Sequence, residues 1–368
     1  MSVATGQARC RWAVVAAGVA LLCALPAIVA AFPVPASPLT PAQLRARVIA
    51  SGDVAYQGYA ESHIDLNLPK LPHLGNVITL LDGTIDQYTW YRSPQQWRAD
   101  MLSAAAENDT YQTSQGVFVW DYASSLLTQI VGNQPVRLPR AADLLPPQLA
   151  RRLLGFAGRA DRMYRLPAQR VAGIDAAGFR LVPGSPASTI GAVDIWADPA
   201  NGVPVQVEIF ARGNSSPVLV SRFLDLEFAR PPVATITPTP GPGVTFAATE
   251  LPNVAGVLNS FGPALPGKLG GANRVPNPGG LANVAAYGSG FARFAVVPLP
   301  ASAGDAVMQT ASSAGASIEV PGSIAAVLIS STLLVMLIVR SPIGHTFLLT
   351  GAVTARELEL AATQLMDY

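Results

Sequence analysis

The sequence predicts an α+β fold, and two observations carry that prediction. The first is a series of short segments between Asp161 and Phe228, each rich in β-branched or aromatic residues and bounded by Gly, Pro, Asn or Asp. The second is a pair of amphipathic helical patterns, at residues 40–52 and 147–157, that do not alternate one-for-one with the strands. Consecutive strands of this kind pair as antiparallel neighbours. We therefore expect an antiparallel sheet with its helices segregated to one side.

The strand signal is strongest around one predicted hairpin. Residues 193–198 and the run that begins at Val205 flank the sequence Asp-Pro-Ala-Asn-Gly at 198–202. Proline fixes φ at about −65° and Asn-Gly accepts positive φ, so the chain reverses direction there. After the turn, Val205, Val207 and Ile209 alternate with polar residues, which places one face of this strand on a core.

The elements before this meander follow from capping and periodicity. Thr40, a proline at the next position and Gln43 form a predicted capping box, which starts a short helix that ends at Gly52. Alternation from Asp53 predicts a first strand. A hairpin is predicted over residues 87–101, with its turn at Ser-Pro-Gln, and a further strand over 116–122. Residues 147–157 then form a helix with one apolar face.

A segment rich in proline and threonine, 230–243, has no apolar periodicity and predicts an extended linker. It separates a first domain at 39–229 from a smaller α+β domain at 244–368. Within the second domain, Ile324 to Val339 is apolar enough to be weighed as a membrane span. It is short for that role, and polar residues at its centre favour two buried strands joined by a turn. Thr354 and Glu357 predict a capping box for a final amphipathic helix.

The N-terminus has the features of an export signal. Arg9 and Arg11 precede an uncharged run from Trp12 to Phe32. Residues 1–36 therefore form either a cleaved signal peptide or a retained N-terminal membrane anchor, and the rest of the chain is expected outside the cytoplasm, secreted or held at the cytoplasmic membrane. Both cysteines of the sequence lie in this segment, so the exported part has no thiol for a disulfide or a metal.

Three runs carry a family resemblance: Arg-Val-Ala-Gly at 170–173, Leu-Val-Pro at 181–183, and Trp-Ala-Asp followed by Asn-Gly-Val-Pro within 196–204. They resemble the sheet of the RseB/MucB family of sigma-factor regulatory proteins, which shares its fold with the lipoprotein carrier LolA. The resemblance covers roughly Thr40 to Phe228 and, more weakly, Val244 to Leu365. It implies a curved antiparallel β half-barrel that encloses helices and leaves an apolar cavity.

Aromatic residues on the predicted strands are the candidates to line that cavity, although core packing or cross-strand pairing is the favoured account of any one of them. They are Tyr88, Trp90, Trp97, Phe118, Trp120, Tyr122 and Trp196. Trp97 and Trp120 lie in the middle of their strands and are expected to share one apolar lining.

Charge and motif content exclude several classes of function. The net charge is +1, with no block of like charges, which argues against nucleic acid or an anionic membrane surface as the main partner. The Gly/Pro/Lys run at 262–269 lacks the hydroxyl and the amides of a phosphate-binding loop, and Ser289 lacks the spacing of a nucleophile elbow. The three histidines are scattered. We expect no cofactor, no metal and no enzymatic activity.

The resemblance therefore implies a non-enzymatic extracytoplasmic protein that binds a lipid, an acylated protein or a membrane partner of the anti-sigma-factor type. The alternative is an accessory or structural module of a membrane-associated transport or envelope complex, held by an uncleaved N-terminal helix. A hydrolase using Ser289 is the third and weakest class.

Overall fold

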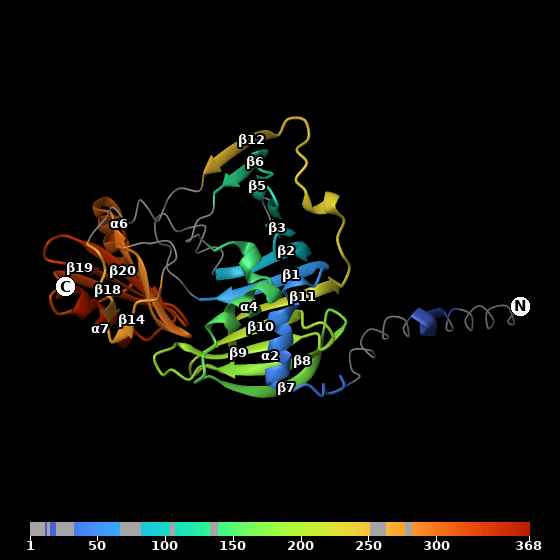
Figure 1. Ribbon diagram of the computed structural model, residues 1–368, viewed down its shortest axis with the longest axis horizontal. Coiled ribbons are helices and arrows are strands. Elements are labelled where there is room, and N and C mark those ends of the chain that lie inside the picture. Colours follow the sequence, from blue (N-terminus) through green and yellow to red (C-terminus); the bar gives the residue numbers. More distant parts are fainter. Residues whose placement is uncertain are drawn as a thin grey trace, which may run out of the picture.

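The computed structural model describes residues 12, 15–19, 33–66, 82–103, 107–132, 139–250, 263–276 and 282–368. Two large β-sheets, each with its own helices, dominate these residues (Figure 1). This confirms the predicted α+β class. The predicted signal peptide or anchor lies largely outside the described residues, as do both cysteines.

The first sheet contains 12 strands among the described residues. They are β1 (Tyr56–Asp65), β2 (Asp82–Ser93), β3 (Gln96–Leu102), β4 (Glu107–Thr113), β5 (Gly116–Asp121), β6 (Leu126–Val131), β7 (Arg162–Val171), β8 (Ile174–Val182), β9 (Ile190–Ala197), β10 (Pro204–Ala211), β11 (Pro217–Glu227) and β12 (Thr245–Glu250). Its helices are α2 (Pro41–Ala50) and α4 (Pro146–Phe156), with the short 3₁₀ turns η1 (Ser51–Asp53), η2 (Ala141–Leu144) and η3 (Val233–Ile236).

The strands of the first sheet follow the order β12-β6-β5-β4-β3-β2-β1-β11-β10-β9-β8-β7. All neighbours pair antiparallel except β12, which lies parallel to β6. Residues 245–250 were expected in the C-terminal domain, but β12 extends the first sheet. The sequence gives no sign of this, because the strand partner of β12 lies more than a hundred residues earlier in the chain.

Helices α2 and α4 pack on one face of the β7–β11 half of the sheet, which we call the inner face (Figure 1). Leu44 and Val48 of α2 and Leu149, Leu153 and Leu154 of α4 are buried there. The capping box of α2 is formed as predicted: the Gln43 amide donates to the Thr40 hydroxyl, and the Thr40 amide donates to the Gln43 side chain. The predicted hairpin at 198–202 is also confirmed, with Gly202 at φ +78°.

We call strands β3 to β6 together with β12 the wing, which extends beyond α2 and α4 (Figure 1). On the wing the burial is reversed. The outer face carries a buried cluster of Tyr111, Phe118, Trp120 and Leu127, against which Val244 packs, whereas the inner-face residues of β5 and β6 are only half-buried.

The cover on the outer face of the wing is the segment that the sequence predicted to be an extended linker. Its η3 turn lies against β3 and β4, and Ile236 in that turn is buried. The Arg98 guanidinium on β3 donates to the Thr235 carbonyl at 3.4 Å. Residues 231–246 therefore pack on the sheet along part of their length. The predicted extended linker would instead have made no such contacts.

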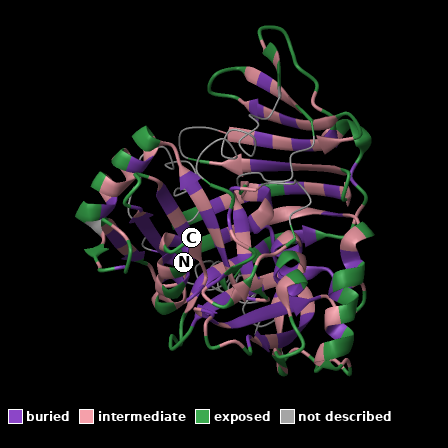
Figure 2. Cartoon of the chain, turned by 60° about the vertical axis from the view of Figure 1, so that its left-hand side comes forward, coloured by how far each residue is buried: buried purple, intermediate pink, exposed green. Residues whose placement is uncertain are grey.

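The C-terminal sheet has the order β15-β16-β20-β19-β18-β17. Its elements are β15 (Ala285–Ser289), β16 (Ala292–Leu299), α6 (Ala301–Ala314), β17 (Ala316–Ser317), β18 (Ala325–Ser330), β19 (Val335–Arg340), β20 (Thr346–Gly351) and α7 (Ala355–Met366), preceded by the short hairpin β13 (Lys268–Leu269) and β14 (Ala272–Asn273). The apolar run at 324–339 forms two paired strands, as predicted. Buried and half-buried residues alternate along many of the strands (Figure 2).

Helix α7 is the predicted final amphipathic helix, and it buries one face that consists of Leu358, Ala361, Ala362 and Leu365. The predicted capping box is not formed, because the Thr354 side chain makes no cap hydrogen bond. Helix α6 was not predicted. Among the described residues, no helix is both long enough and apolar enough to cross a membrane.

The two domains are joined by more than the chain. Ser188 forms a β-bridge with Val353, and the Thr189 amide donates to the Ala352 carbonyl at 3.0 Å. One apolar cluster includes both Ile190 of the first domain and Ile338 of the second.

Candidate functional site

Six of the seven aromatic candidates lie on the outer face of the first sheet, and five of them cluster on β2, on β5 and just after β5. Residues directly opposite on neighbouring strands share a face. One row runs Tyr88, Asp100, Asp109, Trp120, Leu127, and the next runs Trp90, Arg98, Tyr111, Phe118. Tyr122 stacks on Trp120 with ring centroids 4.9 Å apart. These aromatics therefore belong to the face opposite α2 and α4.

Trp97 lies on the inner face, because its partners are Tyr91 on β2 and Gln112 on β4. Trp97 and Trp120, expected to share one lining, are thus on opposite faces of the sheet. Trp196 is buried elsewhere on the outer face: its indole donates to the Pro167 carbonyl at 3.1 Å, and a Cβ at Gly178 would approach its ring to 2.5 Å.

An ion-pair network lies in the middle of the outer-face row. Arg98 donates to Asp100 at 2.6 Å and to Asp109 at 2.8 Å. The hydroxyls of Tyr111 and Tyr122 both donate to Asp109 at 3.0 Å. Burial raises the pKa of Asp100 to about 7, the hydrogen bond from Arg98 opposes that rise, and the charge of Asp109 adds to it. Burial and the same carboxylate raise the pKa of Tyr111.

Asp100, Glu107 and Asp109 are the group of described residues that comes nearest to a metal site, with one oxygen from each within 4.8 Å of the others. Arg98 already supplies positive charge to two of them at hydrogen-bond distance. A guanidinium in that position competes with a cation for the same oxygens. We therefore interpret these carboxylates and Arg98 as a structural ion-pair network. The sequence does not predict this network, because polar residues on a strand carry no periodic signal.

A pocket of about 460 Å³ lies on the inner face at the root of the wing. Its wall combines apolar side chains from β2, β3 and β5 with residues just before and within η2, and these include Ile85, Met101, Val119, Pro139 and Ala141. Thr110 and Asn108 on β4 supply polar groups. An elongated apolar ligand with a polar end matches this lining.

Gln87 on β2 lies directly opposite Met101, which lines this pocket. Gln87 is fully buried, and neither of its side-chain polar atoms has a hydrogen-bond partner among the described residues. No sequence pattern singles it out, because glutamine in a strand is usually exposed.

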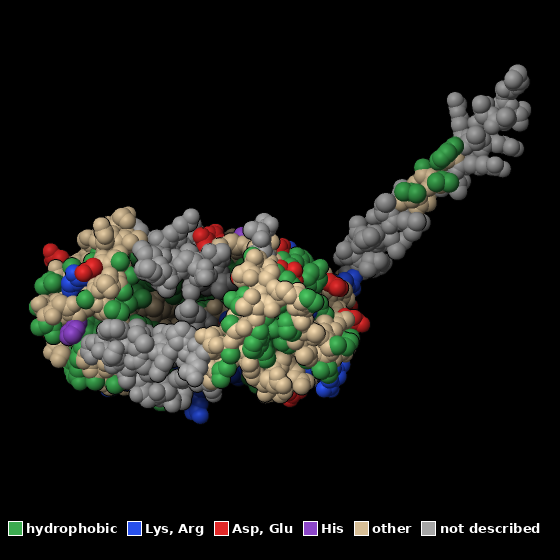
Figure 3. Space-filling model, turned by 90° about the horizontal axis from the view of Figure 1, so that it is seen from above, with side chains coloured by type: hydrophobic (Ala, Val, Ile, Leu, Met, Phe, Trp, Pro, Cys, Tyr) green, Lys and Arg blue, Asp and Glu red, His purple; other side chains and the backbone are tan. Residues whose placement is uncertain are grey.

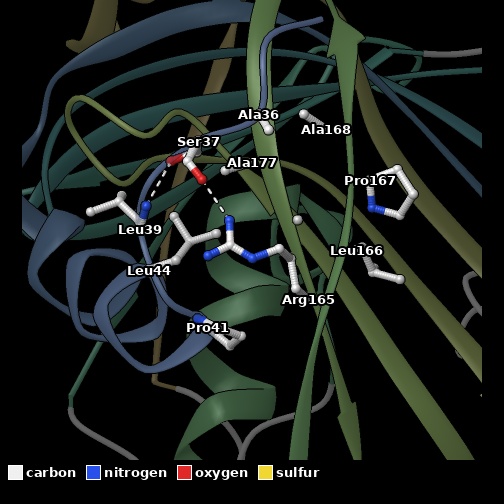
Figure 4. A pocket seen from close by; sticks show the side chains of 11 residues that line it. Ala36, Ser37, Leu39, Pro41, Leu44, Arg165, Leu166, Pro167, Ala168 and Ala177 are labelled. Atoms are coloured by element: carbon white, nitrogen blue, oxygen red, sulfur yellow. Dashed lines mark hydrogen bonds between the residues drawn. The ribbon is translucent and has the colours of Figure 1, made fainter.

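Two further pockets lie between the sheet and segments that cross it. One, of about 290 Å³, is enclosed by the outer face of the wing and residues 233–246. The other, of about 300 Å³, lies where the N-terminal segment meets β7, and Figure 4 shows Arg165 reaching to the Ser37 carbonyl, a contact of 2.5 Å. Both are smaller than the inner-face pocket, which makes the inner-face pocket the stronger ligand candidate of the three.

The lysine-containing loop, Ser289 and His63 belong to no catalytic or metal site among the described residues. The run at 263–269 leads into the short hairpin of β13 and β14. Ser289 ends β15 at a turn. His63 faces Thr84 across a strand pair at 3.0 Å. On the face seen in Figure 3, the described lysine and arginine side chains do not gather into a patch.

No family model matches the chain, and no curated protein matches it. Solved structures do. MucB in the MucA/MucB complex of Pseudomonas aeruginosa is 15% identical over 87% of this chain and 95% of that chain, with a TM-score of 0.49.

A second MucB structure, in complex with MucA(peri), is 14% identical over 88% of this chain and 97% of that chain, also with a TM-score of 0.49. A LolA superfamily protein from Nitrosomonas europaea covers 54% of this chain and 98% of that chain at 10% identity and a TM-score of 0.24. The chain is structurally similar to MucB over most of its length and to LolA-superfamily proteins over about half of it. These are the two families that the sequence resembles.

Proposed function

We propose that this protein is a non-enzymatic, extracytoplasmic binding protein that holds an apolar chain on the inner face of its wing. The observation that carries the proposal is the pocket of about 460 Å³ between β2, β3, β4, β5 and η2. An acyl chain, free or attached to a protein or glycolipid, is the ligand class that fits an apolar lining with a few polar groups.

The exposure of the wing supports the same proposal. On β5 and β6, Val117, Val119 and Ile130 point to the inner face and stay half-buried, whereas Phe118, Trp120 and Leu127 on the outer face are buried in the cluster that Val244 covers. Partly exposed apolar residues in a row are a common feature of binding surfaces. The MucB structures in the comparison contain MucA, and a membrane partner of the anti-sigma-factor type is the protein ligand that the family resemblance implies for this chain.

The test is equilibrium binding of a fatty acid brominated in mid-chain, followed by quenching of tryptophan fluorescence. Trp97 lies on the inner face and is the expected reporter, so Trp97→Phe should remove most of the quenching. Val119→Asp places a carboxylate in the pocket lining and should weaken binding about tenfold or more, because a buried charge is costly in an apolar site.

Val131→Asp is the matched control, since Val131 is on β6, exposed, and on the opposite face. It should leave binding unchanged. Saturable quenching that Val119→Asp and Val131→Asp weaken equally would contradict this site. Absence of quenching in the wild-type protein would contradict an acyl ligand and favour an accessory role in a membrane complex.

A further inference from the structure

The outer face of β1, β2 and β11 concentrates acidic side chains. On the β1–β2 pair, Glu61 lies directly opposite Asp86 and Asp65 directly opposite Asp82. Like charges opposite one another on neighbouring strands destabilise the pair. Two such pairs of carboxylates lie on one face of this hairpin.

Strand β11 adds to the same face. Asp225 lies opposite Tyr59 and Glu227 opposite Gln57. The carboxylates on this face are Glu61, Asp65, Asp82, Asp86, Asp225 and Glu227. Against them stand two arginines: Arg222, which pairs with Glu61 at 3.1 Å, and Arg92, which donates to the Pro231 carbonyl. The whole chain carries a net charge of +1, so this acidity is a local feature and does not follow from the overall composition.

An aromatic ladder runs beside the carboxylates. The rings of Tyr59 and Tyr88 lie 4.8 Å apart and those of Tyr88 and Trp90 lie 6.0 Å apart. Tyr88 is 45% exposed. The guanidinium of Arg98 lies 5.0 Å from the centre of the Trp90 ring, so this ladder already accepts one cation. Aromatic faces and carboxylates both attract ammonium and guanidinium groups.

We propose that this outer face of β1, β2 and β11 is a docking surface for a lysine- or arginine-rich segment of a partner protein. The charge excludes the phosphates of nucleic acids and anionic lipids, which these carboxylates repel. Tyrosine and tryptophan are also the residue types that carry binding energy at protein interfaces. The surface is on the opposite face of the sheet from the inner-face pocket, so it goes beyond the acyl-binding function and can fail or succeed independently of it.

The experiment titrates the full chain with a fluorescent decaarginine peptide by anisotropy, at low and at physiological salt. Decaglutamate, a peptide of the opposite charge, is the control and should not bind. Glu61→Gln/Asp86→Asn should weaken decaarginine binding about tenfold or more, since the charges are removed without loss of shape. Tyr88→Ala should weaken it about two- to fivefold, because an exposed cation–π contact is lost. Asp225→Asn/Glu227→Gln is a second charge variant on the same face.

Glu357→Gln/Glu359→Gln removes the same charge from α7 of the other domain and should leave binding unchanged. If this control weakens binding as much as Glu61→Gln/Asp86→Asn does, the attraction is diffuse and the proposal is overturned. The proposal is also overturned if the wild-type protein does not bind decaarginine at low salt. A parallel titration with chitohexaose tests whether the aromatic ladder binds a saccharide instead. Loss of chitohexaose binding in Tyr88→Ala, with no variant affecting the peptide, would make the ladder a saccharide site and overturn the proposal.

Discussion

At the scale of single residues, the ion-pair network around Arg98 makes a prediction about pH. The pKa of Asp100 is raised from 3.8 to about 7, so between about pH 4 and pH 7 the folded protein holds a proton that the unfolded chain does not. The free energy of unfolding therefore falls as the pH rises through this window. Asp100→Asn cannot titrate, and we expect it to flatten that fall by about 2 kcal/mol.

Urea unfolding of the wild type and Asp100→Asn at pH 5 and pH 8 measures the effect. Asp175→Asn, at an exposed ion pair with Arg170 on another hairpin, is the control and should leave the pH dependence as it is. The same change in stability from pH 5 to pH 8 in the wild type and in Asp100→Asn would show that Asp100 is ionised throughout.

Gln87 makes a second prediction at this scale. Its amide is buried without a hydrogen-bond partner among the described residues, and a buried unsatisfied polar group costs about 1–3 kcal/mol. Gln87→Met has nearly the same length and no polar group to satisfy. We expect it to raise the free energy of unfolding by about 1 kcal/mol in urea titrations. A loss of stability would mean that the amide is satisfied by an ordered water, which methionine would displace.

The aromatic residues show what the sequence can and cannot predict at a site. Alternation correctly places Trp90 and Tyr88 on one face of a strand, and Trp97 in the middle of the next. It cannot tell which face meets α2 and α4, because that depends on the partners of distant strands. The cover over Trp120 comes from residues 233–246, whose composition predicts a segment with no packing of its own.

At the scale of elements, the two capped helices offer a matched pair. Thr40 makes both bonds of its capping box, whereas the Thr354 side chain makes no cap hydrogen bond. Thr40→Ala should therefore lower the free energy of unfolding by about 1 kcal/mol. Thr354→Ala should cost less than about 0.5 kcal/mol. Equal losses in chemical denaturation would show that the Thr354 cap forms in solution.

The elements that the sequence predicted are those whose signal is local. The hairpin at 198–202 depends on its own turn, and α2 on its own capping box. Strand β4 was missed because its residues are largely polar: Asp109 on its outer face is buried, and its Oδ2 pairs with Arg98. Helix α6 was missed because it consists mainly of small residues, and Gly304 allows a close approach to Thr346 on β20. Strand β12 is defined only by its distant partner.

At the scale of the whole molecule, the two domains share both hydrogen bonds and apolar packing. The backbone of residues 187–189 bonds with that of residues 352–354, and the Thr189 hydroxyl donates to the Leu333 carbonyl at 2.6 Å. The apolar cluster of the first domain continues into Ile329, Met336 and Ile338 of the second. Domains joined by such a contact unfold together when the contact is a large part of the stability of either one.

We therefore predict one cooperative unfolding transition for the full chain in scanning calorimetry. Thr189→Pro removes the amide that donates to Ala352 and the hydroxyl that donates to Leu333, without changing either core. It should split the transition in two, with the smaller C-terminal domain unfolding at the lower temperature. Thr189→Val keeps the amide and loses only the hydroxyl bond, so it should lower the midpoint by a few degrees and keep a single transition. Two transitions in the wild type would mean that the shared cluster contributes little, and that each domain is stable on its own.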